Sequence, residues 1–512
     1  MANTIKLAAL LSVIIACNDA GEHDGEDGGY NEPHRPQIHF SPKEKWMNDP
    51  NGLVYYDNRY HLFYQYYPDS TVWGPMHWGH ATSTDLLHWE HQPVALYPDS
   101  LGYIFSGSAV VDENNTSGFG EGRKAPLVAI FTHHDPIGAA QGRNDYQYQS
   151  IAYSLDGIKW TKYAGNPVLK NPGIKDFRDP KVMWHEPSKK WIMSLATLDR
   201  ITFYSSPDLK QWAKESEFGK DMGAHGGVWE CPDLFSFDFN GEKIWALLVS
   251  INPGGPNGGS ATQYFMGKFD GKEFVPLDTV TRWLDHGPDN YAGVTWSNIH
   301  DRRIFIGWMS NWQYGTVVPT EKWRSAMTMP RLIEPQTADG KYVLTSNPIP
   351  EISRLKKGMQ KSFHNLLIED TVVEITTTTD KLTGPAMLTL KADDIKEFAI
   401  TLSNDLGQRV VIGYDKAGNH YYIDRTTSGK TDFEKGFGAR NISPRVRTRP
   451  GMSMTLIIDN SSVEMFADDG LNVMTAIFFP DKIYSKLAMA SPETFRVKSL
   501  SLSGLKSIYR KD

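Results

Sequence analysis

Short apolar runs, broken by glycine, proline, aspartate and asparagine, follow one another along the chain from about residue 36. Examples lie at 53–56, 60–64, 127–131 and 245–250. Their length suits β-strands, and no long stretch repeats its apolar residues every three to four positions, as an amphipathic helix would. The pattern therefore predicts an all-β chain.

A weak internal repeat accompanies these runs. The motif Ser-x-Asp-x-x-x-Trp occurs at 83–89, 154–160 and 206–212, and 268–274 is a degenerate fourth copy. An aspartate that bonds its own turn, followed by a tryptophan that packs back, is typical of a hairpin. The four aspartates are 71, 52 and 62 residues apart, which suits four-stranded propeller blades with loops of variable length. We therefore expect a five-bladed β-propeller over residues 36–345.

The pattern changes after about residue 350. Apolar and polar residues alternate through 371–376, 398–402 and 454–459, as in strands that have one buried face. Motifs that suggest chemistry end at the same point. A C-terminal β-sandwich over 355–512 is the natural interpretation.

Composition and charge narrow the classes of function. The 512 residues exceed one ordinary core, which agrees with two domains. The net charge of −7, without a basic run, argues against a nucleic-acid partner. The 15 Trp, 23 Tyr and 23 Phe residues suit contacts with sugar faces, although aromatic rings also fill β cores.

The N-terminal pattern predicts a targeting segment. Lys6 precedes an apolar run, 7–16, that is too short to span a bilayer. Because Cys17 follows Ile-Ile-Ala, the segment resembles a bacterial lipoprotein signal; the alternative is an ordinary signal peptide cut nearby. We expect residues 1–17 to be a signal peptide with a lipidated Cys17, and residues 18–35 to be a flexible acidic tether.

Such an anchor would place the protein on the bacterial outer membrane. A cell-surface position is favoured, with a periplasmic one as the alternative, and other glycan-uptake proteins are candidate partners. Cys231 is the second of the two cysteines. With Cys17 acylated, no intramolecular disulfide can form, so stability must come from packing.

Three acidic residues stand in unusual settings. Asp49 lies in Trp46-Met-Asn-Asp-Pro-Asn-Gly52, Asp179 in Phe-Arg-Asp-Pro-Lys, and Glu230 in Trp-Glu-Cys-Pro-Asp. The two aspartates precede proline, which is expected to hold each one extended and Asp49 in a stiff turn. A single Asp-Pro is most simply a structural turn. Three such motifs in one propeller instead suggest carboxylates that meet in a central funnel.

These motifs, in this order, resemble glycoside hydrolase family 32, the β-fructofuranosidases, which include invertases, inulinases and levanases. Further matches are Phe63-Tyr-Gln65, Trp73-Gly74, Phe105-Ser-Gly-Ser108, the segment 323–331 and Val463-Glu-Met-Phe466. The resemblance extends from residue 36 to the end. It implies a five-bladed propeller followed by a β-sandwich, which agrees with the pattern above.

The resemblance also implies roles in a retaining glycosidase, which needs a nucleophilic carboxylate and an acid/base. Asp49 matches the nucleophile, Glu230 the acid/base and Asp179 the stabiliser of the transition state. Residues that match the family's fructose pocket, or are candidates for it, are Asn48, Gln65, Trp73, Phe105, Ser106, Arg178 and Trp312.

No cofactor or metal is expected. His77 and His80 lack a third ligand motif and are interpreted as structural. Cys231 has no evident histidine partner, so packing is its expected role.

The expected activity is hydrolysis of fructans, with levan favoured and endo action open. The alternatives are an exo-inulinase or invertase, a fructosyltransferase, and a fructan-binding protein without catalysis. The family often has Asn-Pro where this chain has Tyr67-Pro68, a departure that concerns the rim of the pocket and not the chemistry. Linkage preference and exo or endo mode depend on rim loops that the sequence leaves open.

Overall fold

The computed structural model describes residues 29–509. The predicted signal peptide, with Cys17, and most of the predicted tether lie outside the described residues. Within them, the non-strand elements are helix α1 (Pro136–Ala140) and the short 3-10 helices η1 (Glu186–Ser188) and η2 (Pro350–Leu355). The prediction of an all-β chain is therefore confirmed. No helix of residues 29–509 is long and apolar enough to cross a membrane.

Five sheets form successive blades, in which neighbouring strands run antiparallel. Blade 1 contains β1 (Lys45–Tyr56), β2 (Arg59–Tyr67), β3 (His77–Ser83) and β4 (Glu90–Leu96); blade 2 contains β5 (Tyr103–Val111), β6 (Leu127–His134), β7 (Gln147–Ser154) and β8 (Thr161–Lys162); blade 3 contains β9 (Phe177–His185), β10 (Lys190–Thr197), β11 (Arg200–Ser206) and β12 (Ala213–Phe218). Blade 4 contains β13 (Val228–Phe239), β14 (Glu242–Asn252), β15 (Ala261–Phe269), β16 (Phe274–Pro276) and β17 (Arg282–Trp283); blade 5 contains β18 (Tyr291–Thr295), β19 (Ile304–Trp308), β21 (Arg331–Ala338) and β22 (Lys341–Pro348).

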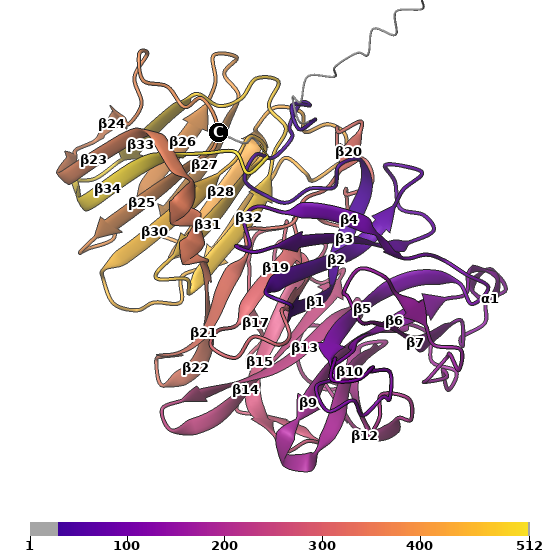
Figure 1. The fold of residues 1–512 in the computed structure, drawn as a ribbon. Coiled ribbons are helices and arrows are strands. Elements are labelled where there is room, and N and C mark those ends of the chain that lie inside the picture. The colour runs from indigo at the N-terminus through magenta and orange to yellow at the C-terminus, as the bar shows by residue number, and fades with distance from the viewer. Residues whose placement is uncertain (1–28, 510–512) are drawn as a thin grey trace, which may run out of the picture.

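The blades close into a ring through their first strands. Contacts link β1 to β5, β5 to β9, β9 to β13, β13 to β18, and β18 back to β1. The short strand β20 (Trp323–Arg324) adds to β1 in parallel, and Ser297 of blade 5 bridges Val54 of blade 1. These five sheets confirm the predicted five-bladed propeller (Figure 1).

The repeated motif joins the third and fourth strands of blades 1 to 4. In each copy one aspartate oxygen accepts two backbone N–H groups of the same turn, and these residues are Asp85, Asp156, Asp208 and Asp270. In two copies the tryptophan indole also bonds the turn: Trp89 donates to Leu86 O and Trp212 to Leu209 O. The sequence repeat therefore marks the same type of hairpin turn in four blades.

A sandwich of two six-stranded sheets follows, in orange and yellow in Figure 1. One sheet has the order β23 (Lys356–Ile368), β34 (Phe495–Leu505), β25 (Ala386–Ala392), β30 (Met452–Ile458), β31 (Ser462–Ala467), β32 (Asn472–Ile477). The other has the order β24 (Thr371–Glu374), β33 (Lys486–Ser491), β26 (Phe398–Ser403), β27 (Arg409–Asp415), β28 (His420–Thr427), β29 (Arg440–Pro444). Alternating side chains of both sheets form one apolar core.

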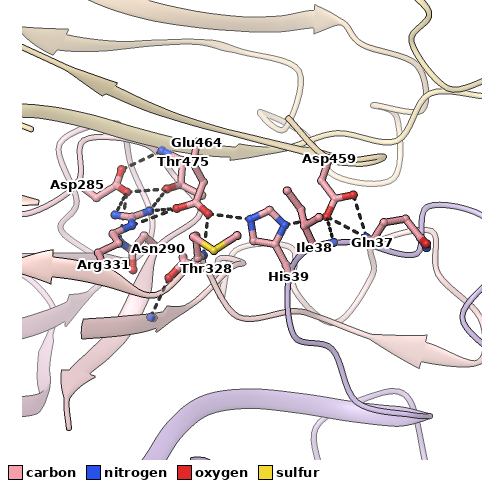
Figure 2. A network of polar contacts seen from close by, with 12 residues as sticks. Gln37, Ile38, His39, Asp285, Asn290, Thr328, Arg331, Asp459, Glu464 and Thr475 are labelled. Carbon is pink, nitrogen blue, oxygen red and sulfur yellow. Dashed lines mark hydrogen bonds and ion pairs between the residues drawn. The ribbon is translucent and has the colours of Figure 1, made fainter. Parts of the chain in front are cut away.

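Buried charges hold the propeller against the sandwich. Figure 2 shows the imidazole of His39 between Asp459 and Glu464, with each ring nitrogen 2.8 Å from a carboxylate oxygen. Glu464 also accepts from Arg331, whose guanidinium bonds Asp285 at 2.8 Å. All five side chains are almost completely buried. Their mutual pairing offsets the cost of removing these charges from water.

Candidate active site

Each of the five innermost strands carries a β-bulge, where two of its residues face one residue of the next strand. The bulged pairs are Asn48–Asp49, Phe105–Ser106, Asp179–Pro180, Cys231–Pro232 and Ala292–Gly293. A bulge bends its strand and re-aims the side chains beside it. The residues at or next to these bulges form one polar cluster near the centre of the propeller.

Two local expectations are wrong. Asp49 lies inside strand β1 and not in a turn, and Asp179 has a φ of 64°, in the left-handed region and not extended. Cys231 and Ala292 have φ values of 47° and 53° at the corresponding bulges. In each case the bulge, which interrupts the regular ladder, imposes the conformation.

Neighbouring residues fix the direction of Asp49. The Trp46 indole donates to Asn48 Oδ1 at 2.7 Å, and Asn48 Nδ2 donates to Asp49 Oδ1 at 3.0 Å. From blade 2, the Ser106 hydroxyl donates to Asp49 Oδ2 at 2.8 Å. Asp49 is only 9% exposed. The predicted pocket residues Asn48 and Ser106 therefore contact the predicted nucleophile itself.

Cys231 links two of the predicted carboxylates. Its backbone N–H donates to Asp179 Oδ2 at 3.1 Å, and its Sγ lies 3.6 Å from the same oxygen and 3.8 Å from Asp49 Oδ2. Burial, and then the surrounding carboxylates, raise the pKa of this thiol well above its ordinary value. Cys231 is buried in a hydrophobic cluster, as expected for packing, and it is also a neutral donor between Asp49 and Asp179.

Both oxygens of Glu230 are bonded. Arg178 donates through Nε and Nη2 to Oε1, at 3.0 and 2.9 Å, and is itself paired with Asp176 at 2.6 Å. The Tyr291 hydroxyl, from blade 5, donates to Oε2. Burial, and then the charge of Glu230, raise the pKa of Tyr291 well above its ordinary value, so the hydroxyl remains a donor.

The crowding of acids changes their proton affinity. Burial, followed by the charge of Glu230, raises the pKa of Asp49 to about 6. Burial also raises the pKa of Asp179 to about 7; Arg178 opposes this increase, and Glu230 and Asp49 add to it. The three carboxylates thus lie close enough to influence one another's charge, and Asp49 and Asp179 both contact Cys231, which follows Glu230. Blades 1, 3 and 4 thus bring Asp49, Asp179 and Glu230 together.

The other predicted pocket residues lie around this cluster. Gln65 is buried and donates to Asn51 Oδ1 at 2.7 Å and to Ile104 O at 3.1 Å, so it braces β1 against β5. Trp73 is 39% exposed, and its ring lies edge-on to Phe105 at 5.9 Å. Trp312 stacks on Trp46 at 6.0 Å.

Sequence reasoning missed Tyr291, the contribution of the fifth blade. It lies in Asn290-Tyr-Ala-Gly293, which contains no carboxylate and no proline. The sequence offered only its position in the last part of the predicted propeller, 36–345.

The histidines set aside as structural make protein contacts. His80 Nε2 lies 3.1 Å from His61 Nδ1, and His77 Nδ1 lies 2.9 Å from Pro75 O. Across residues 29–509, no group of three or more His, Cys, Asp or Glu side chains is arranged to hold a metal ion.

Comparison with known proteins shows which family models and relatives the chain matches. The model of the glycosyl hydrolases family 32 N-terminal domain matches residues 39–348, and that of the family 32 C-terminal domain matches 351–503. Levanase of Bacillus subtilis (strain 168) is 46% identical over an aligned length of 493 residues, and the alignment covers 94% of this chain and 72% of that protein.

Two solved structures show the same architecture. The exo-inulinase from Aspergillus awamori has a TM-score of 0.85 at 37% identity, over 94% of this chain and 99% of that one. The β-fructofuranosidase from Schwanniomyces occidentalis complexed with fructosyl-erythritol has a TM-score of 0.84 at 32% identity, over 93% of this chain and 99% of that one.

Proposed function

Because the chain belongs to glycosyl hydrolase family 32, we propose that it hydrolyses β-fructofuranosidic linkages of fructans with retention of configuration. The observation that carries the proposal is the meeting of three carboxylates from three blades. Asp49 and Asp179 contact the same thiol, and Glu230 precedes that cysteine in the chain. Retaining glycosidases use two carboxyl groups about 5 Å apart, one on each side of the scissile bond.

In the first step Asp49 attacks the anomeric C2 of a fructosyl unit, and Glu230 gives its proton to the leaving oxygen. In the second step Glu230 removes a proton from water, which attacks C2 and releases Asp49. Asp179 binds hydroxyl groups of the fructosyl ring and stabilises the positive charge that develops in the transition state. Ser106 and Asn48 hold Asp49 on the line of attack.

The reaction requires a charged Asp49 and a protonated Glu230. Near neutral pH the raised pKa values of Asp49 and Asp179 keep a proton within the cluster. Substrate hydroxyls that donate to the two aspartates stabilise their charged forms. Binding therefore favours a charged Asp49 and leaves the shared proton available for the leaving oxygen.

The preferred substrate in this proposal is levan. The 46% identity to a levanase supports it, whereas the likeness to an exo-inulinase makes inulin the main competitor. Separate digestion of levan, inulin and sucrose, with sizing of the early products, tests both linkage and mode. Levan should be cleaved fastest. Early fructose alone would mean exo action, and a ladder of oligomers would mean endo action.

The matched control is Asp49→Asn, which keeps the shape of the side chain. This variant should release no sugar from levan, inulin or sucrose. Fructan binding with no turnover by the unchanged protein would contradict the proposed enzyme. New oligosaccharides in place of free fructose at high sucrose concentration would indicate a fructosyltransferase.

We also propose that the protein is tethered to the bacterial outer membrane through a lipid on Cys17. The motif around this cysteine supports the proposal, and a surface position suits a polymer that must be cut before uptake. Replacement of Cys17 by Ser should move the protein from the membrane fraction to the soluble fraction. Unchanged membrane association would contradict the anchor.

A further inference from the structure

A chain of hydrogen bonds leads from Glu230 to a histidine that has no role in the steps above. Arg178, which holds Glu230, approaches Gln147 Oε1 through Nη1 at 3.4 Å. Gln147 is almost completely buried, and its Nε2 lies 3.3 Å from His134 Nδ1. His134 is the last residue of β6 in blade 2.

A backbone N–H group sets the direction of the hydrogen bonds between Arg178, Gln147 and His134. The Phe177 N–H, which can only donate, contacts Gln147 Oε1 at 2.9 Å. The atom of Gln147 that faces His134 is therefore the amide nitrogen, which donates. His134 Nδ1 must accept, so the neutral ring carries its proton on Nε2. Burial, and then the charge of Arg178, lower the pKa of His134 to about 4, which keeps the ring neutral near pH 7.

Three aromatic rings hold this imidazole in place. Phe105 stacks on it at 4.3 Å, Tyr103 stacks at 6.0 Å, and Tyr146 meets it edge-on at 5.2 Å. Phe105 precedes Ser106, which bonds Asp49. The His134 ring is half-buried, and its Nε2–H has no hydrogen-bond partner among residues 29–509. The structure thus presents a fixed and unused donor beside the site.

The position of this donor indicates which part of the substrate it meets. Glu230 protonates the leaving oxygen, so the leaving sugar lies on the side of Glu230. Arg178 and Gln147 connect Glu230 to His134 on that side. We propose that the His134 Nε2–H donates a hydrogen bond to a hydroxyl of the leaving sugar, and that His134 thereby selects saccharide leaving groups. This inference rests on the proposed function and adds a residue for recognition of the leaving group.

Two variants remove the donor. His134→Phe keeps a flat ring against Phe105, and His134→Met offers Gln147 a weak sulfur acceptor in case the first variant does not fold. His134→Gln retains both an acceptor and a donor. His88→Phe, at an exposed hairpin of blade 1, is the matched control. The substrates are levanbiose and inulobiose, whose leaving sugars have hydroxyls, and methyl β-fructofuranoside, whose leaving group has none.

Loss of one neutral hydrogen bond should lower kcat/KM for the disaccharides about fivefold to tenfold in the Phe and Met variants. The rate on methyl β-fructofuranoside should stay unchanged, His134→Gln should recover most of the loss, and His88→Phe should match the parent. Equal losses on all three substrates, or no loss on the disaccharides, would overturn the inference. A parent protein inactive on all three would overturn the proposed function as well, so the two failures are distinguishable.

Discussion

Among residues 29–509, only one of the three carboxylates of the site is directly bonded to a cation. Arg178 is bonded to Glu230, whereas the donors to the Asp49 and Asp179 side chains, in the described part of the chain, are neutral groups of Asn48, Ser106 and Cys231. Neutral donors stabilise a buried carboxylate less than a guanidinium does. Burial is the main cause that raises the pKa values of the two aspartates, to about 6 and about 7, and their neutral donors offset it only in part.

The first prediction is a narrow pH profile. Below about pH 6 Asp49 becomes protonated and cannot attack; above about pH 7 the cluster loses the proton that Glu230 needs. We expect kcat/KM, which reports the free enzyme, to peak between these values, with both limbs belonging to the coupled cluster.

The acidic limb can be assigned to Asp49 with one variant. The Asn48 side chain lowers the pKa of Asp49, so Asn48→Ala should move this limb to higher pH. The check is kcat/KM measured from pH 4 to 9 for both proteins. A profile that remains flat down to the ordinary carboxylate range near pH 4 would contradict the assignment.

At the scale of residues, the sequence indicated side chains whose neighbours form a motif. Asp49, Asp179 and Glu230 stand beside prolines and aromatic rings, and the structure brings them together. Tyr291 and His134 stand in no such motif. Their roles depend on partners 61 residues away, at Glu230, and 13 residues away, at Gln147. Such pairings follow from the closure of the ring and the register of its strands, which local pattern does not specify.

At the scale of elements, the five bulges decide which side chains reach the centre. Three of them are followed by or contain proline, at Pro50, Pro180 and Pro232, and Gly107 and Gly293 stand at the other two. Proline suits a bulge because it has no N–H to give to the ladder. The same residues are typical of turns. A local pattern therefore cannot separate a turn from a bulge until the partner strand is known.

The hairpins between the third and fourth strands of the blades lie apart from the active site, and their aspartates can be tested one at a time. Asp208 Oδ1 accepts the N–H groups of Lys210 and Gln211, both at 2.9 Å. Asp208→Ala leaves these donors to water and should lower the free energy of unfolding by ~1 kcal/mol. Asp208→Asn keeps an acceptor oxygen and should cost much less.

Denaturant unfolding of the three proteins measures this difference. The rate kcat should be equal in all three, because the turn joins β11 to β12 at the outer end of blade 3. An alanine variant as stable as the parent would show that the repeated motif does not stabilise its hairpin.

At the scale of the whole molecule, a buried charge network joins the two domains (Figure 2). The sequence resemblance singled out Glu464, but its partners Arg331 and His39 lie 133 and 425 residues away. Fold class and domain order follow from short-range alternation and repeats. The interface does not, because it depends on charges that meet only after both domains have folded.

The central histidine of this network predicts an alkaline limit of stability. Burial alone would lower the pKa of His39, but its bonds to Asp459 and Glu464 outweigh this and raise it to about 9, above the ordinary 6.5. The stabilisation is therefore complete below pH 6.5 and is lost as the pH rises through 9. The rise of about 2.5 pKa units corresponds to ~3 kcal/mol, at 1.36 kcal/mol for each unit.

Unfolding free energies from pH 6 to 9.5 test this. The parent should lose most of that stabilisation between pH 6.5 and 9.5. His39→Gln should be less stable at pH 6 and should lose little more on going to pH 9.5, whereas His88→Gln, an exposed control, should follow the parent. Parallel curves for the parent and His39→Gln would contradict a charged His39 at the interface.

The central claim is that Asp49 and Glu230 act on one fructosyl unit, the first as nucleophile and the second as acid/base. The most direct measurement is peptide mass spectrometry of Glu230→Gln after reaction with a β-fructofuranoside that carries a nitrophenyl leaving group. Such a leaving group needs no acid, whereas release of the enzyme needs a base. We predict that a fructosyl unit accumulates on the peptide that contains Asp49; an adduct on another residue, or rapid turnover with no adduct, would contradict the account.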